Sequence, residues 1–375
     1  MNPQRIAVIE WGCLEGLRPR HAGSNARLSD HGKTVRVPLA RLTTEDGASG
    51  FGVCRANREQ AEVLLGQSFE SLFSPQSGVL PSWRSFDFPL WDLAGQRAGQ
   101  PIYALAAPDT KLAAPFRVPC YDTSLYFDDL HLSDEVEAAA LIAAEALEGF
   151  ERGHRNFKIK VGRGARHLPL ESGTRRDIAI IRAVCQSVGP HLMLDANNGY
   201  NLNLTKRVLE ETADCGVIWM EEAFHEDAVL YRDLKEWLAA RELPILIADG
   251  EGEASPSLLD WAREGLADVI QYDIFGHGFS RWLETGRKLD GIGVRSAPHH
   301  YGGHYGNYAT YHLAGALKNF TYVEWDEVTT PGLDGSAYEI CDGHVCVPDA
   351  PGFGLHLDEA AFRQAVVTNG YRCAL

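Results

Sequence analysis

Short apolar runs, each ending on or just before a polar residue, recur along the middle of the chain. The runs cover residues 116–121, 157–161, 192–195, 217–221, 245–249, 269–273, 294–298 and 321–324. Segments with apolar residues at helical spacing lie between them, at 135–149, 173–187, 205–212, 228–240, 257–265, 280–289 and 307–317. This alternation predicts a barrel of parallel strands joined by helices, because right-handed strand-helix-strand crossovers keep the strands parallel. The C-termini of such strands meet at one mouth, where scattered polar residues would form a single site.

The two ends of the chain carry a different pattern. Runs at 5–11, 34–42 and 50–55 predict an antiparallel meander, and residues 85–101 predict a helix closed by glycine and proline. Asp92 in that helix is expected to be bound by a neighbouring backbone. Beyond residue 324 come loops, short strands and a helix at 357–368, too little chain for a core of its own. We therefore divide the chain into an N-terminal α+β part (1–115), a barrel (116–324) and a C-terminal tail (325–375) that completes the N-terminal part.

Composition narrows the class of protein. Of the 375 residues, 45% are hydrophobic and 23% are charged, which is typical of a globular chain. The net charge of -16 would repel nucleic acid and anionic membranes, so neither is expected as a partner. No signal peptide or membrane-spanning run is evident, and the eight cysteines lie far apart without a metal or redox motif. We expect a cytoplasmic protein whose cysteines are small buried side chains.

Three carboxylates follow successive predicted strands, namely Asp195, Glu221 and Glu251. Held together, they would repel one another unless a cation lay among them. Ligands that offer only oxygen favour a hard divalent ion, with Mg2+ the first choice and Mn2+ the second. Glu222 and Asp249 are neighbours of these positions and remain alternatives to Glu221 and Glu251.

Lys158 and Lys160 are two positions apart on one strand, so both side chains point to the same face. Two ammonium groups close to each other and to a metal ion lower each other's pKa, which predicts a neutral amine near pH 7. A lysine tuned in this way can act as a general base. The Gly162-Arg163-Gly164 segment that follows is interpreted as a plain turn rather than a phosphate loop.

Asp273 and His299 end neighbouring predicted strands. A carboxylate bonded to one imidazole nitrogen fixes the tautomer and raises the pKa, and the other nitrogen can then exchange a proton. Across the mouth from Lys160, His299 would provide a second acid/base group on the opposite face of a substrate. A zinc site on His299, His300 and His304 is disfavoured, because two glycines weaken the helix that the last two histidines would need.

The segment between the first two predicted strands, residues 16–33, is strongly cationic in an acidic chain. It carries Arg18, Arg20, His21, Arg27, His31 and Lys33. One interpretation is a solvated loop whose charge is incidental. The other is a flexible lid that closes over an anionic substrate.

Taken together, these features make the chain resemble the enolase superfamily, specifically its mandelate racemase subgroup. The motifs that carry the resemblance are Trp91-Asp92, Lys158-x-Lys160, Asp195-x-Asn197, Glu221-Glu222, Gly250-Glu251, Gln271-x-Asp273, Pro298-His299 and Val323-Glu324. The resemblance implies a modified TIM barrel, (β/α)7β, with an α+β capping domain formed from the N-terminal region and the C-terminal tail. It also implies Mg2+ on the three carboxylates and a homo-oligomer, either a dimer or an octamer.

The resemblance further implies a role for each polar residue at the mouth. Lys160 is similar to one acid/base catalyst of the family, and Lys158 is similar to the charged residue beside that catalyst. The Asp273–His299 pair is similar to the other acid/base group. Glu324 is similar to a residue that donates a hydrogen bond to the enolate oxygen. The chain also departs from the family pattern. Ala223 replaces the proline that usually follows the Glu-Glu pair, and Gly276-His277-Gly278 replaces a Gly-Gly, so that His277 becomes a candidate substrate contact. The doubled His299-His300 leaves the catalytic partner uncertain by one place, and alignment on Pro298 favours His299.

From these roles we expect removal of the α proton of a carboxylic acid, with the developing negative charge stabilised by the metal, Lys158 and Glu324. The cationic segment suits a sugar acid, so we expect loss of water to a 2-keto-3-deoxy acid. A racemase, an epimerase or a lactone cycloisomerase would use the same parts, and binding without turnover is the alternative from another class. A hydrolase is disfavoured, because its mechanism does not call for paired lysines. The expected substrate contacts are Asn197, Arg18, Arg20, His21, Tyr126, His277 and His300.

Overall fold

The computed structural model describes residues 4–110, 112–252 and 254–375. Residues 1–3 lie outside these ranges. They begin the N-terminal stretch in which the sequence shows no signal-peptide pattern. Among the described residues, every helix is too short or too polar to cross a membrane.

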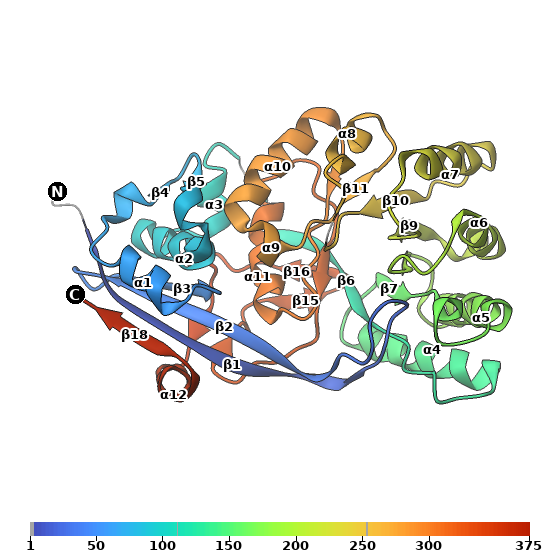
Figure 1. Cartoon of the computed structure of the whole chain (residues 1–375), viewed down its shortest axis with the longest axis horizontal. Helices are drawn as coiled ribbons and strands as arrows, with labels where there is room; N and C mark the ends of the chain where they lie inside the picture. Colours follow the sequence, from blue (N-terminus) through green and yellow to red (C-terminus); the bar gives the residue numbers. More distant parts are fainter. Residues whose placement is uncertain (1–3, 111, 253) are drawn as a thin grey trace.

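Parallel strands from β6 to β13 are connected by pairing into an arrangement that we call the ring, and it lies beside the sheet near the two termini (Figure 1). Neighbours in sequence are neighbours in the sheet from β6 to β12, and β13 pairs with β6. A bridge from Ser296 to Phe320, just before β13, continues the hydrogen bonding from β12 toward β13. The predicted order of seven strand-helix units and a last strand is confirmed. The strands are β6 (Arg117–Leu125), β7 (Phe157–Lys160), β8 (Leu192–Asp195), β9 (Val217–Glu221), β10 (Leu246–Asp249), β11 (Val269–Ile270), β12 (Arg295–Ser296) and β13 (Val323–Trp325).

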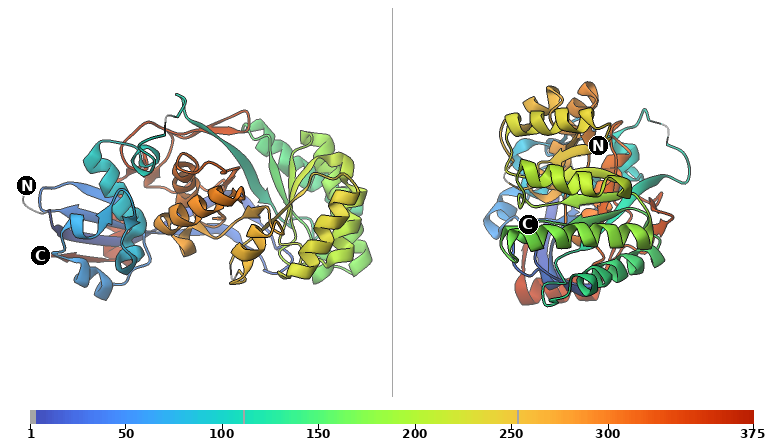
Figure 2. Two further views of the ribbon diagram at one scale, coloured as in Figure 1. Left: turned by 90° about the horizontal axis from the view of Figure 1, so that it is seen from above. Right: turned by 90° about the vertical axis from the view of Figure 1, so that its right-hand side faces the viewer.

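Helices cover the outside of the ring, as the end-on view in Figure 2 shows for those between β6 and β10. Asp134, Asn201 and Asp227 precede three of them and accept hydrogen bonds from first-turn N–H groups, which fixes where these helices begin. The helices that follow the first seven strands are α4 (Glu135–Glu151), α5 (Leu170–Val188), α6 (Leu202–Glu211), α7 (Ala228–Ala240), α8 (Leu258–Arg263), α10 (Phe279–Ile292) and α11 (His304–Ala314).

Side chains from alternate strand positions fill the inside of the ring. A buried apolar cluster that includes Met193 and Trp219 crosses it. Because strand side chains alternate in direction, the residues two positions further along, Asp195 and Glu221, point into the same interior. The apolar cluster therefore forms a floor beneath the polar residues at the C-terminal end of the ring.

A second sheet, in the order β18-β1-β2-β3, is antiparallel and joins the two ends of the chain. Its strands are β1 (Ile6–Ala22), β2 (Gly32–Thr44), β3 (Ser49–Val53) and β18 (Tyr371–Ala374), and α2 (Asp87–Ala98) and α12 (Glu359–Asn369) lie beside it (Figure 1). Asp92 of α2 is buried and accepts hydrogen bonds from the backbone N–H groups of Phe51 and Phe353, both at 2.9 Å. The backbone partner predicted for Asp92 is confirmed.

Shorter elements connect these parts. They are α1 (Arg58–Leu64), η1 (Phe69–Ser71), β4 (Phe73–Ser74), β5 (Gly78–Val79), η2 (Pro81–Phe86), α3 (Ile102–Ala106), η3 (Arg163–Ala165), η4 (Ala213–Cys215), α9 (Ile274–His277), β14 (Leu333–Asp334), β15 (Glu339–Cys341), β16 (His344–Cys346) and β17 (His356–Leu357).

The cationic segment 16–33 is not a flexible loop along most of its length, and this expectation is wrong. β1 continues to Ala22 and β2 begins at Gly32, so only residues 23–31 connect them. Figure 1 shows this long ribbon running from the N-terminal sheet to the end of the ring near β7. The N–H of Leu17 also donates to the Thr329 carbonyl at 2.8 Å, which anchors the ribbon to the chain after β13. Charged residues and Pro19 hide the strand pattern here, and residues 18–21 of β1 lie in an irregularity of the pairing between Leu17–Thr34 and Ala22–Gly32.

Candidate active site

Asp195, Glu221 and Glu251 converge at the C-terminal end of the ring. Asp195 ends β8 and lies in register with Glu221 at the end of β9, while Glu251 follows β10. One carboxylate oxygen of each residue lies within 4.8 Å of the other two. Oε2 of Glu251 is buried and has no hydrogen-bond partner among the described residues. An all-oxygen cluster with an unpartnered carboxylate oxygen fits a hard divalent cation.

The two neighbouring acids have other partners. Glu222, at a φ of 42°, accepts a hydrogen bond from Asn197 Nδ2 at 3.0 Å. Asp249 accepts a hydrogen bond from the Tyr231 hydroxyl. Burial raises the pKa of both carboxyl groups, that of Glu222 to about 8. The sequence left both acids open as metal ligands, and the structure groups neither of them with Asp195.

The lysines of β7 point into the same cluster. Lys158 Nζ lies 2.7 Å from Oε1 of Glu221, 3.1 Å from Oε1 of Glu324 and 3.5 Å from Oδ2 of Asp195. Lys160 Nζ donates to Oδ2 of Asp195, which lies opposite it in the sheet register. Both lysines therefore face carboxylates from a buried position.

The neutral lysine that the sequence predicts depends on a metal ion at these carboxylates, so it stays a prediction. Burial lowers the pKa of Lys158, but Glu221 and Glu324 outweigh burial and raise the pKa well above its usual value. Burial and the repulsion from Lys158 also lower the pKa of Lys160, and Asp195 raises it overall. The lysine–lysine repulsion is present, but the attraction to the carboxylates is larger because ammonium and carboxylate are in direct contact.

Asp273 and His299 form a hydrogen-bonded pair. His299 Nδ1 lies 3.2 Å from Oδ2 of Asp273, and its Nε2 lies 3.5 Å from Oε1 of Glu251. Burial lowers the pKa of His299, but the surrounding carboxylates, Glu251 first, raise it to about 10. Lys160 thus reaches the cluster at Asp195, whereas His299 reaches it at Glu251, so the two groups approach different carboxylates.

The other histidines of this region are bonded elsewhere. Nε2 of His300 lies 2.6 Å from the backbone oxygen of Glu324. Both ring nitrogens of His304 are occupied at 2.8 Å, Nδ1 by the Thr330 hydroxyl and Nε2 by the Tyr308 hydroxyl. Of the two adjacent histidines, His299 is therefore the one that pairs with Asp273, whereas Nε2 of His300 faces the Glu324 backbone. The geometry also gives no support to a zinc site on these histidines.

Glu324 accepts hydrogen bonds on both carboxylate oxygens. The Thr123 hydroxyl donates to Oε1 at 2.7 Å, and the N–H groups of His300 and Tyr301 donate to Oε2 at 2.7 and 2.9 Å. Burial raises the pKa of Glu324, but Lys158 and the nearby histidines lower it well below its usual value. This surrounding favours the ionised carboxylate, so the donor role that the resemblance implies stays a prediction.

Two of the predicted cationic substrate contacts, Arg20 and His21, bind other residues of the chain. Nη2 of Arg20 donates to the backbone oxygen and the hydroxyl of Ser124, at 3.0 and 2.7 Å, and Nε lies 3.6 Å from Glu145 of α4. His21 falls on the opposite face of β1, where it pairs with Asp30 at 3.2 Å and its side chain is 53% exposed. Strand alternation explains why His21 points away, and we leave both residues out of the proposed site.

Tyr126 lies beside the proposed catalytic lysine, and Tyr301 connects it to Arg18. The Arg18 guanidinium is 4.5 Å from the ring centre of Tyr301 and 3.6 Å from Asp326. Tyr301 stacks on Tyr126 with ring centres 4.8 Å apart, and Lys160 Nζ lies 5.3 Å from the Tyr126 ring. These side chains form an aromatic wall next to the ammonium group.

The last two predicted contacts differ in their surroundings. The N–H of Asn197 donates to Oδ1 of Asp195 at 3.0 Å, and its own Oδ1 is buried without a hydrogen-bond partner among the described residues. His277 packs within the helical layer, where Nε2 lies 2.9 Å from the Thr285 hydroxyl and the ring stacks on Tyr272. Asn197 stays a candidate substrate contact, and we leave His277 out of the proposed site.

Four residues of the site were not predicted from the sequence. Gln271 Nε2 and Trp219 Nε1 donate to Oε2 of Glu221 at 2.9 and 3.0 Å. Both could have been found by the two-residue strand period, because each stands two positions before an acid of the site. The same period applies to Thr123, which stands two positions after Tyr121 of the inner cluster on β6. Tyr301 carries no comparable signal, since the loop conformation after β12 brings its backbone to Glu324.

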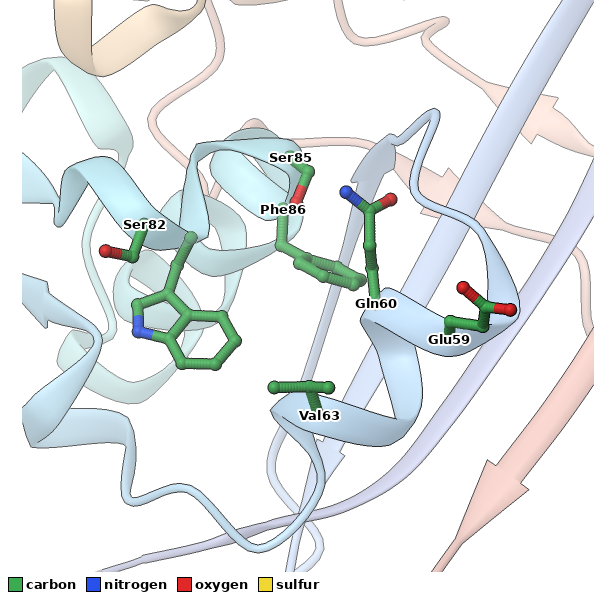
Figure 3. A pocket seen from close by; sticks show the side chains of 7 residues that line it. Glu59, Gln60, Val63, Ser82, Ser85 and Phe86 are labelled. Carbon is green, nitrogen blue, oxygen red and sulfur yellow. The ribbon is translucent and has the colours of Figure 1, made fainter.

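A separate pocket of about 380 Å³ lies on the N-terminal part, between α1 and η2 (Figure 3). Its lining residues are Glu59, Gln60, Val63, Ser82, Trp83, Ser85 and Phe86. Among these residues only Glu59 has an acidic or basic side chain, so the lining lacks a pair of proton-transfer groups. We assign no chemistry to this pocket.

Comparisons with known proteins agree with this geometry. The family described as enolase C-terminal domain-like matches residues 141–361. The structure of a galacturonate dehydratase from Geobacillus sp., complexed with D-galacturonate and 5-keto-4-deoxy-D-galacturonate, is 47% identical, covers 99% of each chain and superposes with a TM-score of 0.95. A mutant of a galacturonate dehydratase from Geobacillus sp., complexed with Mg, gives a TM-score of 0.97 at 47% identity, covering 99% of this chain and 97% of that one.

More distant relatives span most of the chain as well. An arabinonate dehydratase from Saccharolobus solfataricus is 24% identical and aligns with 96% of this chain and 97% of its own. A D-galactarolactone cycloisomerase from Agrobacterium fabrum is 25% identical, with 87% of this chain and 90% of its own aligned.

Proposed function

The chain belongs to the enolase C-terminal domain-like family, and from this premise we propose that it is a Mg2+-dependent dehydratase of sugar acids. The observation that carries the proposal is a pair of proton-transfer groups at one carboxylate cluster. Lys160 bonds to Asp195, and His299 faces Glu251 at 3.5 Å. A protein that only bound a sugar acid would need no second proton-transfer group.

Asp195, Glu221 and Glu251 are the proposed ligands of the metal ion. When bound, Mg2+ supplies positive charge that stabilises the anion formed as the α proton leaves. Mn2+ has the same preference for oxygen ligands and is the alternative ion. Gln271 and Trp219 support this assignment, because their N–H groups orient the carboxylate of Glu221.

Lys160 and His299 are the proposed acid/base catalysts. One of them takes the proton from the α carbon, and the electron pair of that C–H bond forms a carbon–carbon double bond. The C–O bond at the β carbon breaks, and the other group protonates the departing hydroxyl, which leaves as water. The enol then rearranges to the 2-keto-3-deoxy acid. Asp273 holds the tautomer of His299 that leaves Nε2 facing the cluster, and Lys158 adds positive charge beside it.

A sugar acid fits the remaining polar groups of the site. We propose Arg18, Tyr126 and Asn197 as contacts to its hydroxyl groups. Tyr126 lies beside Lys160 and Asn197 beside Asp195, and Arg18 packs on Tyr301, which stacks on Tyr126. Nε2 of His300 is bonded to a backbone oxygen, but its Nδ1 is buried without a hydrogen-bond partner among the described residues, so His300 also stays a candidate contact. D-Galacturonate is the first substrate to test, since it is bound in the structure of a relative at 47% identity.

Proton NMR in D2O tests the proposal. The protein and Mg2+ are incubated with D-galacturonate and a panel of aldonic and aldaric acids. Keto-acid formation supports dehydration, whereas α deuteration without loss of water supports a racemase or epimerase that uses the same two groups. Unchanged substrate protons across the whole panel would argue against any turnover.

We also propose the setting in which the protein works. All eight cysteines, every one of them in the described ranges, are free of disulfides, as a reducing compartment such as the cytoplasm requires. The pairing of β18 with β1 supports a capping domain built from both ends of the chain. A homo-oligomer, a dimer or an octamer, is proposed from the family alone.

A further inference from the structure

Arg163, the first residue of η3 after β7, carries a fully buried guanidinium group. Nε and Nη2 donate to Oδ1 of Asp129 at 2.9 and 2.7 Å, and Nη1 donates to Oδ1 of Asp177 at 2.8 Å. The guanidinium carbon lies 4.2 Å from the ring centre of Phe127. The segment that the sequence presents as a plain turn therefore contains a buried cluster of ions.

The remaining N–H groups of Arg163 reach the backbone of two residues of the active site. Nη1 donates to the carbonyl oxygen of Lys160 at 3.1 Å, and Nη2 donates to that of Tyr126 at 3.5 Å. The Tyr126 ring in turn lies 5.3 Å from Lys160 Nζ. One side chain thus holds both the backbone that carries Lys160 and the ring beside its ammonium group.

Asp177 of α5 extends the cluster to the neighbouring strand end. It accepts hydrogen bonds from the N–H of Gly162 and from the Tyr200 hydroxyl, both at 2.8 Å. Tyr200 stands five residues after Asp195, in the segment that follows β8. The cluster therefore joins the segments after β6, β7 and β8, which supply the aromatic wall, the lysine and one carboxylate of the site.

Stability alone is a poor explanation for such a cluster. Arg163 and Arg176 face Asp129 and Asp177, so the charges balance, and all four residues are buried. The desolvation of buried charges offsets most of their attraction, and well-packed apolar side chains often stabilise as much or more. The guanidinium offers five N–H donors in a fixed plane, which lysine does not. Its distinctive contribution here is geometric.

We propose that Arg163 is a positioning residue for Lys160. It holds the carbonyl oxygens of Lys160 and Tyr126 in a fixed relation, and in this way it directs Lys160 Nζ toward the atom with which it exchanges a proton. This inference rests on the proposed function, because it gives Lys160 a proton-transfer role. Misplacement of a catalytic group by about 1 Å can lower the rate about 100-fold, even when the change lies outside the reacting atoms.

Arg163→Lys tests the inference, because it keeps the charge and removes the planar set of donors. We expect kcat for the sugar acid to fall about 10- to 100-fold with little change in KM. The isotope effect on kcat should grow, either with α-deuterated substrate or in D2O, because proton transfer becomes slower. The matched control is Arg176→Lys. Arg176 contacts Asp129 at 3.5 Å and donates to the carbonyls of Leu132 and Ser133 at 2.9 and 3.1 Å.

A purely structural role for the cluster would lower the unfolding temperature in both variants and leave kcat the same in both. Equal kcat values in the folded Arg163→Lys and Arg176→Lys proteins would overturn the inference while the dehydratase proposal stands. Absence of turnover in the unmodified protein would overturn both. If Arg163→Lys does not fold, Tyr200→Phe replaces it, since it removes the hydroxyl bonded to Asp177 without a change in charge. Lower kcat at constant KM in that variant supports the inference, and unchanged kcat contradicts it.

Discussion

Nδ1 of His299 lies 3.2 Å from Oδ2 of Asp273, and this contact leaves Nε2 of the same ring directed at Glu251. Asp273 also accepts hydrogen bonds from the N–H groups of Phe275 and Gly276, at 3.0 and 2.7 Å, at the start of α9. The same carboxylate therefore begins a helix and fixes the tautomer of the proposed catalyst.

Asp273→Asn separates these two functions. The amide can still accept the backbone hydrogen bonds, but it removes the charge that supports a protonated imidazole. We expect kcat to fall about 100- to 10,000-fold, the range that a general acid or base contributes. Steady-state kinetics measures this fall, and a Mg2+ titration should give an affinity close to that of the unmodified protein. Asp227→Asn, at the start of α7, is the control for a cap substitution. Full activity of Asp273→Asn would remove the dyad from the mechanism.

Glu251→Gln tests the proposed metal ligands. We expect a loss of more than about 100-fold in Mg2+ affinity, because removal of a group that only orients a ligand already costs about 10- to 100-fold. Isothermal titration calorimetry measures the affinity directly. Asp249→Asn is the matched control. Asp249 accepts a hydrogen bond from Tyr231, and burial raises the pKa of its carboxyl group. The substitution therefore replaces a carboxyl group that favours its neutral form with a neutral amide. Equal affinities in the two variants would contradict the assignment of Glu251.

The strand-end pattern could predict which distant residues meet. Parallel neighbouring strands end at one edge of the ring, and Lys160, Asp195 and Glu221 therefore lie opposite one another in successive strands. The period of two along a strand explains why all of them point inward. For this part of the site, the position of each residue in its strand was enough.

Distances and loop conformations could not be predicted in the same way. The sign of the pKa shift at Lys160 depends on how closely Asp195 approaches it, and residue spacing does not contain that distance. Tyr301 comes from the segment between β12 and α11, whose path depends on packing against other parts of the chain. Cys341 is exposed, contrary to the expectation of buried cysteines, because it ends a short strand paired only with β16.

Tyr301→Phe is predicted to weaken substrate binding without weakening the fold. The Tyr301 hydroxyl is buried and has no hydrogen-bond partner among the described residues, while its ring stacks on Tyr126. If the hydroxyl binds the sugar acid, its loss should raise KM about 3- to 10-fold, the value of one hydrogen bond. Urea unfolding should show equal or greater stability, since an unpaired buried hydroxyl is removed. Tyr311→Phe, in α11, serves as the control, and an unchanged KM for Tyr301→Phe would exclude this contact.

Ala26→Leu should prevent the tip of the β1–β2 ribbon from docking on the ring. A Cβ atom added at Gly162 or Gly199 would lie 2.9 or 2.6 Å from the Ala26 Cβ, so the two glycines form a close-fitting seat for this methyl group. A larger side chain there would be overpacked by about 1–3 kcal/mol, which would raise KM about 10-fold or more if docking encloses the substrate.

Leu28→Ala is the control in the same tip, because Leu28 is 48% exposed. Its KM should remain close to that of the unmodified protein. Ala26→Leu should lose at most about 1–3 kcal/mol of stability, because the overpacking is confined to the tip, whereas Leu28→Ala should unfold close to the temperature of the unmodified protein. A normal KM for Ala26→Leu would show that docking of the tip is not needed for binding.

His154 should make folding stability depend on pH. It is fully buried, and Nε2 lies 2.8 Å from Oε1 of Glu327, while Arg152 donates to the same oxygen at 3.0 Å. Burial lowers the pKa of His154, but bonds to Cys120 and Glu327 and the charge of Asp122 raise it to about 10.

The sign follows from the two states of the chain. Below pH 6.5, the usual pKa of histidine, the folded and unfolded chains both carry the proton, and the stabilisation by Glu327 is complete. As the pH rises toward about 10, the unfolded chain loses its proton first, so the stabilisation declines by about 1 kcal/mol per pH unit. Above that pH the folded chain is neutral at this position as well, and the contribution is gone. Urea unfolding of the unmodified protein and of His154→Gln between pH 6 and 10 should therefore show a difference that is largest at pH 6 and shrinks with rising pH. His131→Gln, at an exposed position, should show no such trend, and a constant difference for His154→Gln would contradict a charged, paired histidine.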